Sequence, residues 1–204
     1  MIAEVVSKGE RTRQAVMDSA YGLFMEHGFH ATSMRQIAER AELALGGIYN
    51  HFSSKEEIFA AILFDKHPYR KILPHILAAE GATIEEFIHD AAKAMVSELR
   101  REPNLLKLMF IELVEFNGKH VPLLIREIVP KILPVFERLV RMHRDLRPIH
   151  PAVLLRSFLG MFFSFFVTEL FLGGALLGKL MPRNSFEIFV DIYLHGILKH
   201  KEAA

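Results

Sequence analysis

The stretch that decides the fold runs from Ser33 to Lys55 and reads SMRQIAERAELALGGIYNHFSSK. Ser33, with Gln36 three residues later, fits a capping box, in which each side chain satisfies a backbone N–H at the start of a helix. The apolar residues that follow recur at helical spacing: Met34, Ile37, Ala38 and Ala41. A turn at residues 42–44 and a short helix from Leu45 to His51 complete the pattern. The stretch therefore predicts a helix-turn-helix.

This stretch resembles the DNA-binding segment of the TetR family of bacterial repressors. The residues that carry the resemblance are Thr32–Ala38, Gly46, Tyr49, His51–Phe52 and Lys55–Glu57. It covers roughly residues 10 to 65, while the rest of the chain matches only in being helical. The resemblance implies a homodimer that places the second motif helix in the major groove of a palindromic, double-stranded DNA operator. It also implies a transcriptional repressor.

The chemistry of the motif and the resemblance together predict which residues meet DNA. Phosphate contacts, which position a protein without reading sequence, are expected at Thr32, Ser33, Arg35, Tyr49, His51 and Lys55. Contacts to bases or the groove are expected at Leu45, Gly46, Gly47 and Asn50.

The motif departs from the family pattern at four positions. Glu42 stands where a glycine commonly ends the first motif helix, and a non-glycine residue in the left-handed region costs roughly 1–2 kcal/mol. Ala44 replaces the usual serine cap, and Leu45 and Gly47 replace polar groups. We therefore expect apolar contacts to thymine methyl groups, a dependence on DNA shape and a modest sequence preference.

Composition limits the class of protein but does not identify it. The 204 residues are 51% hydrophobic and carry a net charge of +1. Residues 1–66 hold seven Lys and Arg against nine Asp and Glu, a formal charge of −2, so affinity for DNA must come from local clustering of cations. The chain has no cysteine and we read no signal peptide, which together indicate a cytoplasmic protein.

Outside the motif the sequence shows helical periodicity and no strand pattern. We expect an all-α protein with a three-helix DNA-binding domain at residues 1–54 and a helical effector-binding and dimerisation domain at residues 55–204. The expected helices outside the motif span residues 11–27, 55–67, 83–101, 105–116, 121–146, 150–172 and 184–200.

Capping and breaking residues set these limits. Gly28 is expected to end the first helix in the left-handed conformation. A glutamate three residues downstream predicts capping boxes at Ser53 or Ser54, Thr83 and Asn184. Because proline costs an interior helix roughly 3 kcal/mol, helices are expected to end, split or kink at Pro68, Pro74, Pro130 and Pro134.

Two C-terminal segments are apolar on more than one face. Residues 158–178 are long enough to cross a bilayer, which leaves a membrane-associated helical protein as an alternative, but Glu169 lies at their middle. A soluble protein buries such a helix partly inside the subunit and partly against a partner. We therefore expect the segments at 150–172 and 184–200 to form the dimer interface, without a membrane.

The C-terminal domain also supplies side chains for a mainly hydrophobic small-molecule effector. The candidate lining residues are Phe87, Met95, Met109, Phe110, Glu112, Phe116, Met142, Phe158, Met161, Phe162 and Phe165. No cofactor is expected.

A ferritin-like di-iron enzyme is the other alternative. Glu86 and His89 have the Glu-x-x-His spacing of such sites, but two such motifs are needed and Glu86 suits a capping box better. The histidines have no convincing zinc spacing, and no serine has an adjacent base in a recognisable motif. We therefore expect no metal, no catalytic residues and no enzymatic activity.

Overall fold

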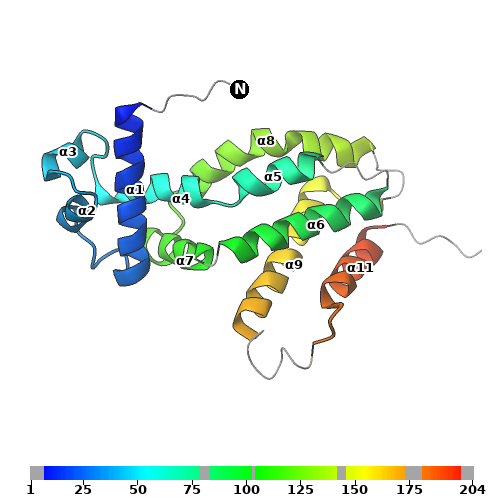
Figure 1. Ribbon diagram of the computed structural model, residues 1–204. Coiled ribbons are helices and arrows are strands. Elements are labelled where there is room, and N and C mark those ends of the chain that lie inside the picture. The colour runs from blue at the N-terminus through cyan, green and yellow to red at the C-terminus, as the bar shows by residue number, and fades with distance from the viewer. Residues whose placement is uncertain (1–6, 79–82, 103, 142–145, 173–180, 199–204) are drawn as a thin grey trace, which may run out of the picture. The chain divides into compact units, whose positions relative to one another are not determined.

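The computed structural model describes residues 7–78, 83–102, 104–141, 146–172 and 181–198. Most of these residues are helical, with one isolated bridge between Leu146 and Leu198 and no named strand among them, as expected for an all-α protein. The helices are α1 (Lys8–His27), α2 (Met34–Arg40), α3 (Leu45–Tyr49), α4 (Lys55–Lys66), α5 (Tyr69–Ala78), α6 (Ile84–Arg101), α7 (Leu105–Phe116), α8 (Val121–Arg141), α9 (Pro151–Leu172) and α11 (Ser185–Ile197) (Figure 1).

The chain forms two compact units. The N-terminal unit comprises residues 1–67 and 104–126, and the bundle unit comprises residues 68–103 and 127–204. This division differs from the boundary predicted after residue 54. The apolar side of α4 lies in the core of the N-terminal unit, with Ile58 and Leu63 fully buried, and α7 joins the same unit.

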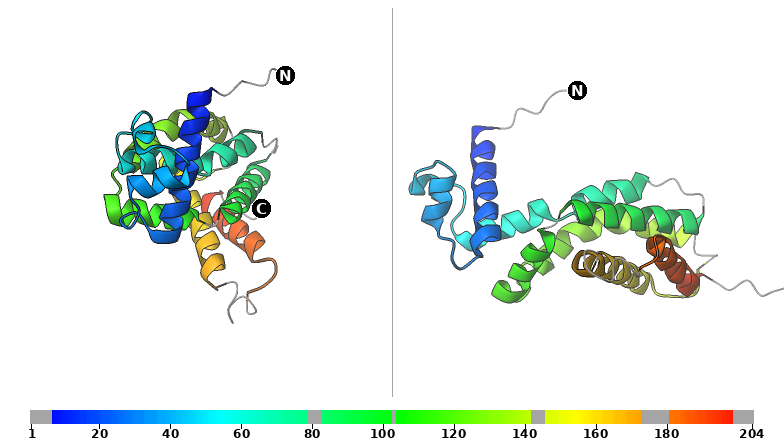
Figure 2. Two further views of the ribbon diagram at one scale, coloured as in Figure 1. Left: turned by 60° about the vertical axis from the view of Figure 1, so that its left-hand side comes forward. Right: turned by 60° about the horizontal axis from the view of Figure 1, so that its bottom comes forward.

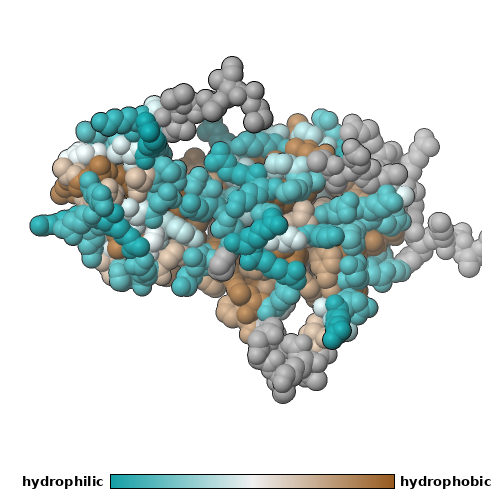
Figure 3. All heavy atoms as spheres, viewed as in Figure 1, coloured by the Kyte–Doolittle hydropathy of each residue, from teal (hydrophilic) through white to brown (hydrophobic). Residues whose placement is uncertain are grey.

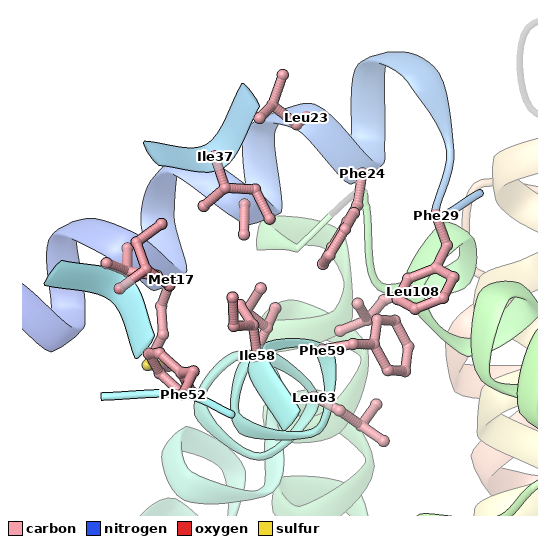
Figure 4. Close-up of a cluster of buried hydrophobic side chains, with 14 of the residues drawn as sticks. Met17, Leu23, Phe24, Phe29, Ile37, Phe52, Ile58, Phe59, Leu63 and Leu108 are labelled. Carbon is pink, nitrogen blue, oxygen red and sulfur yellow. The ribbon is translucent and has the colours of Figure 1, made fainter. Parts of the chain in front are cut away.

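The core of the N-terminal unit is aromatic at its centre. Phe24 of α1, Phe29 of the following loop and Phe59 of α4 lie with ring centroids 5.3 to 6.1 Å apart (Figure 4). Leu108 of α7 lies in the same cluster and is only 1% exposed. Residues far apart in sequence therefore build one core.

Both ends of α1 differ slightly from the prediction. The helix begins at Lys8 rather than Arg11, because the Ser7 side chain accepts a hydrogen bond from the Glu10 amide. Gly28 ends it with a positive φ of 83°, as expected, but its ψ of 168° lies outside the left-handed helical region. The Gly28 amide still donates to the Phe24 carbonyl and closes the last turn.

Capping boxes were predicted correctly in part. Thr83 forms the expected box with Glu86 at the start of α6, and Ser54 rather than Ser53 caps α4. Asn184 makes no side-chain cap hydrogen bond, so that prediction was wrong. Glu187 instead lies 3.2 Å from His89 of α6.

The prolines interrupt the helices less than expected. Pro68 separates α4 from α5, as predicted, but Pro74 lies inside α5, and Pro130 and Pro134 lie inside a single α8. Each proline removes one backbone N–H from the helix. Burial of Leu124 and Val135 on the inner side of α8 favours its continuation despite that loss.

In the bundle unit, α9 packs against both α6 and α11 (Figure 2). Phe158 and Phe162 of α9 contact Tyr193 of α11 with ring centroids 5.7 and 5.9 Å apart. The Tyr193 hydroxyl donates to the Leu154 carbonyl at 2.8 Å. Arg100 of α6 forms a bidentate pair with Glu169 of α9. The helix pair predicted as an interface is thus also part of the subunit core.

The stability of the fold should fall in mild acid because of His67. Burial lowers the pKa of His67 from 6.5 to about 4. The unfolded chain therefore binds this proton more readily, and stability present above pH 6.5 is lost as the pH falls towards 4. The loss should reach roughly 3 kcal/mol, and chemical denaturation of wild type and His67→Gln across this range should show a flatter acid dependence in the variant. Parallel curves would contradict this assignment.

Candidate nucleic-acid interface

The first motif helix begins as predicted. The Ser33 hydroxyl oxygen accepts from the Gln36 amide at 3.2 Å, and the Ser33 amide donates to Gln36 Oε1 at 2.7 Å. The Ser33 hydroxyl also donates to Gln36 Oε1. This capping box fixes an exposed hydroxyl at the N-terminus of α2, where backbone N–H groups favour an anion.

The turn after α2 is a Schellman motif without glycine. The Leu43 amide donates to the Ala38 carbonyl, and the Glu42 amide donates to the Glu39 carbonyl. Glu42 has a φ of 54°, in the left-handed region, as its position predicted. The strain at Glu42 is offset by these two bonds and by packing of Leu43 against the core.

The second motif helix, α3, is held from one side only. Ile48 is fully buried and Phe52, just after the helix, is 1% exposed. Leu45 and Tyr49 are 42% and 52% exposed, and Asn50 is also exposed. α3 ends at Tyr49, earlier than the predicted His51. The residues expected to meet bases therefore lie on a free face, and Figure 3 shows hydrophobic surface there.

The glycines of α3 face open space. A Cβ atom built at Gly46 or Gly47 would meet no heavy atom within 4 Å. The free protein therefore does not need glycine at either position for packing. Glycine at these positions would instead allow the α3 backbone to approach another molecule closely.

Four predicted phosphate-contacting residues are accessible. The Arg35 side chain is 83% exposed and lies 3.3 Å from Glu39 one turn away. Ser33 and Tyr49 are exposed and His51 is partly exposed. Since the Arg35 pair is solvated, the guanidinium can turn to a phosphate at little cost.

Thr32 is buried and Lys55 is partly exposed, and both make contacts within the unit, so their predicted phosphate contacts stay a prediction. Thr32 is 2% exposed, and its hydroxyl donates to the Gly28 carbonyl at 2.9 Å. The Lys55 ammonium donates to the carbonyls of Phe29 and Thr32 at 2.6 and 2.5 Å and lies 4.3 Å from the Phe29 ring centroid. Burial lowers the Lys55 pKa. Both residues hold the loop between α1 and α2.

Two further arginines have structural contacts that the sequence pattern did not reveal. The Arg40 guanidinium makes two 2.8 Å hydrogen bonds to Glu26 and lies over Gly22, where a Cβ would come within 2.9 Å of it. The Arg13 guanidinium lies 4.2 Å from the Phe52 ring centroid. The sequence signal for the Arg40 contact is Gly22 inside α1, because a larger residue at this position would collide with the Arg40 guanidinium.

The residues predicted to line an effector pocket are divided between the units. Met109, Phe110, Glu112 and Phe116 belong to the N-terminal unit. Those in the bundle unit are Phe87, Met95, Phe158, Met161, Phe162 and Phe165. Met142 lies outside the described residues.

Within each unit most of these side chains are packed rather than arranged around a cavity. The ring centroids of Phe165 and Phe189 lie 4.9 Å apart, and Phe116 stacks on Phe59 with ring centroids 4.8 Å apart. Phe110 is 56% exposed. A hollow in the bundle unit is open and has a mainly acidic lining of Glu85, Glu86, His89, Asp90, Glu187, Val190, Asp191 and Leu194. Most of the described candidates therefore contribute to packing within their own unit, and the apolar pocket stays a prediction.

The Glu-x-x-His pair of the di-iron alternative is engaged in other contacts. Glu86 accepts from the Thr83 amide in the capping box, and His89 contacts Asp90 and Glu187. These contacts give both side chains a structural role, and the alternative is not favoured.

Comparisons with known proteins agree with the motif. Residues 16–62 match the family model of bacterial regulatory proteins, tetR family. The probable acrEF/envCD operon repressor of Escherichia coli K12 is 29% identical over 114 residues, which are 53% of this chain and 51% of that protein. The chain thus spans about half the length of this curated relative.

Solved structures share the fold over nearly the whole chain. GusR of Salmonella enterica has a TM-score of 0.72 and 20% identity, covering 96% of this chain and 99% of its own. SmeT in complex with triclosan has a TM-score of 0.65 and 21% identity, covering 93% and 92%.

The N-terminal geometry and these matches define a fold with an N-terminal helix-turn-helix and a helical C-terminal part. The family match covers residues 16–62, so the N-terminal part of the chain is similar to the DNA-binding part of the tetR family.

Alanine at Gly46 or Gly47 should separate folding from DNA binding. Each variant should be more stable, because alanine favours a helix over glycine by about 1 kcal/mol and the new methyl group meets open space. If the α3 backbone enters the groove closely, each should also bind DNA less tightly. Thermal unfolding and a binding titration test both parts, and unchanged DNA affinity in both variants would contradict the close approach.

Proposed function

We propose that the protein is a ligand-responsive transcriptional repressor that binds a palindromic operator as a homodimer. The observation that carries this proposal is the free outer face of α3, anchored from behind by Ile48 and Phe52 and preceded by a capped α2. Such a protein acts by binding rather than by catalysis, and it works in the cytoplasm, where its DNA is.

The proposed DNA contacts are made by the motif residues whose side chains or backbone are at least partly exposed. Phosphates are contacted by Ser33, Arg35, Tyr49 and His51. The groove is entered by Leu45, Gly46, Gly47 and Asn50. Because Asn50 is the only one of these four with a polar side chain, we infer a strong contribution from DNA shape and from contact with thymine methyl groups.

The proposed homodimer forms through the outer faces of α9 and α11. Leu159 and Phe163 of α9 are 44% and 36% exposed, and Ile188 and Ile192 of α11 are 40% and 56% exposed. Their spacing of one helical turn gives each helix an apolar stripe. A second copy that covers these stripes would form a four-helix interface and hold the recognition helices about 34–36 Å apart, one turn of B-DNA.

A membrane-associated protein is the second candidate, because α9 is long and apolar enough to cross a bilayer by length and composition. Among the described residues it is the one helix with this property. The bidentate pair of Glu169 with Arg100 disfavours this reading, since it would place a charged group within the apolar span.

The proposed effector is a mainly hydrophobic small molecule. Support comes from the aromatic side chains of α6 and α9 and from the solved complex of SmeT, a protein of the same fold, with triclosan. The lining residues stay a prediction, because most of the described candidates are packed within their units. Coupling between effector and DNA is reciprocal, so each must weaken the binding of the other by the same factor.

The DNA-binding proposal is tested by selection from a random duplex pool followed by titration of the selected site. We expect a two-fold symmetric sequence. Arg35→Ala should weaken binding to all duplexes and reduce the slope of log affinity against log salt by about one for each phosphate that the guanidinium neutralises. Lys55→Ala should instead lower stability, because it removes the two carbonyl contacts. Failure of the wild-type protein to enrich any sequence would refute the function.

The dimer proposal is tested with Leu159→Glu and Ile192→Glu in one chain. The paired charges should give a folded monomer, measured by light scattering and circular dichroism. Leu113→Glu is the matched control, since Leu113 is 62% exposed on α7 of the N-terminal unit. A dimer that survives the double substitution would rule out this interface, and wild-type protein that partitions into lipid vesicles would favour the membrane alternative.

A further inference from the structure

A buried histidine–carboxylate pair closes the turn between α7 and α8. Glu112 is 1% exposed and His120 is 6% exposed. Glu112 Oε1 accepts from the His120 amide at 2.7 Å, and Glu112 Oε2 lies 2.8 Å from His120 Nδ1. Glu112 was predicted to line an effector pocket, but both of its oxygens are engaged within the N-terminal unit.

The pair is connected to the first turn of α4. The other ring nitrogen of His120 lies 3.4 Å from Glu56 Oε1, and Lys119 donates to the same oxygen at 2.5 Å. The His120 ring also lies 4.9 Å from the Phe116 ring and 6.0 Å from the Phe59 ring. The imidazole therefore sits between a carboxylate of α7 and a carboxylate of α4.

The start of α4 is in turn connected to the start of α2. Lys55, the residue before Glu56, donates to the carbonyls of Phe29 and Thr32, directly before the Ser33 cap. A second contact runs in parallel, since His30 in the same loop pairs with Glu115 of α7. Polar contacts thus join α7 to the first turn of α4, and the neighbouring residue of that turn joins it to the loop before the helix-turn-helix.

Polar side chains join these helices beside the aromatic core. A buried polar pair contributes little net stability compared with apolar packing, because desolvation opposes the attraction. Its directional hydrogen bonds do fix the relative position of the groups that it joins. The unit already has an aromatic core at this place, so these contacts fix the relative position of the helices more than they add buried apolar surface.

We propose that Glu112, His120 and Glu56 are positioning residues for DNA binding. They hold the first turn of α4 against α7, and through Lys55 they set the orientation of the helix-turn-helix relative to α4 and α7. This inference rests on the proposed DNA-binding function. None of the three residues is proposed to touch DNA.

The consequence differs between half-sites and full operators. A helix-turn-helix that has lost its fixed orientation can still dock on one half-site. It loses affinity for two half-sites at fixed spacing, because both motifs must then be ordered in one orientation on binding, and this ordering costs free energy. Removal of a phosphate-binding side chain, in contrast, weakens both and changes the salt dependence.

The experiment uses the full-length chain with His120→Gln, Glu112→Gln and Glu56→Gln. Glu56→Gln keeps the shape of a half-exposed side chain and is the variant expected to fold if the buried substitutions do not. Lys71→Gln is the control, because it removes the Lys71–Glu102 pair within the bundle unit. Arg35→Ala provides the comparison for removal of a phosphate-binding side chain.

We expect affinity for the full operator to fall about tenfold, as for removal of one charged hydrogen bond, with half-site affinity and salt slope unchanged. Full-operator affinity within twofold of wild type for Glu56→Gln and every other folded variant, or an equal reduction on half-site and full operator, would overturn the proposal.

Hydrogen exchange of the free protein provides a readout that does not depend on DNA. The amides of residues 29–33 should exchange faster in Glu56→Gln and His120→Gln than in wild type or Lys71→Gln. If wild type binds no specific DNA, the proposed function fails while this measurement still tests the contacts. Unchanged exchange in both variants would overturn the inference alone.

Discussion

The motif helices α2 and α3 are too short to be stable alone, and this constraint shapes the whole N-terminal unit. An isolated helix needs about 12–15 residues to be even marginally stable in water, and α2 and α3 have 7 and 5. Their conformation therefore depends on burial of Ile37, Ile48 and Phe52 against α1 and α4. The aromatic core is what makes a recognition surface of so few residues possible.

The same constraint explains why the unit recruits α7. The core cluster of buried residues includes Leu108, with Met109 and Phe116 packed against it. The helices α1, α2 and α3 leave one side of Phe59 on α4 to be covered, and Phe116 stacks there. The segment that covers the core also carries Glu112 and His120, so apolar packing and polar orientation come from one element.

Local signals were predictable from the sequence, and long-range contacts were not. The caps at Ser33 and Thr83 and the strained Glu42 follow from a few neighbouring residues, and the structure has them. The pairing of Lys55 with the carbonyls before Ser33 spans more than 20 positions, and nothing in local spacing indicates it. An apolar residue such as Phe116 likewise looks the same in sequence whether it lines a cavity or fills a core.

The inward placement of cations leaves the recognition surface with few charges. Arg13 stacks on Phe52, Arg40 pairs with Glu26, and Lys55 holds a loop. Arg35 is the strongly exposed arginine at the start of α2, beside an α3 with two open glycines. With so few cations, general attraction to phosphate would be weak in the proposed DNA complex, and the free energy of binding would come largely from the fit between backbone and groove. Such a fit tolerates little rotation, so affinity depends on how rigidly α2 and α3 are oriented within their unit.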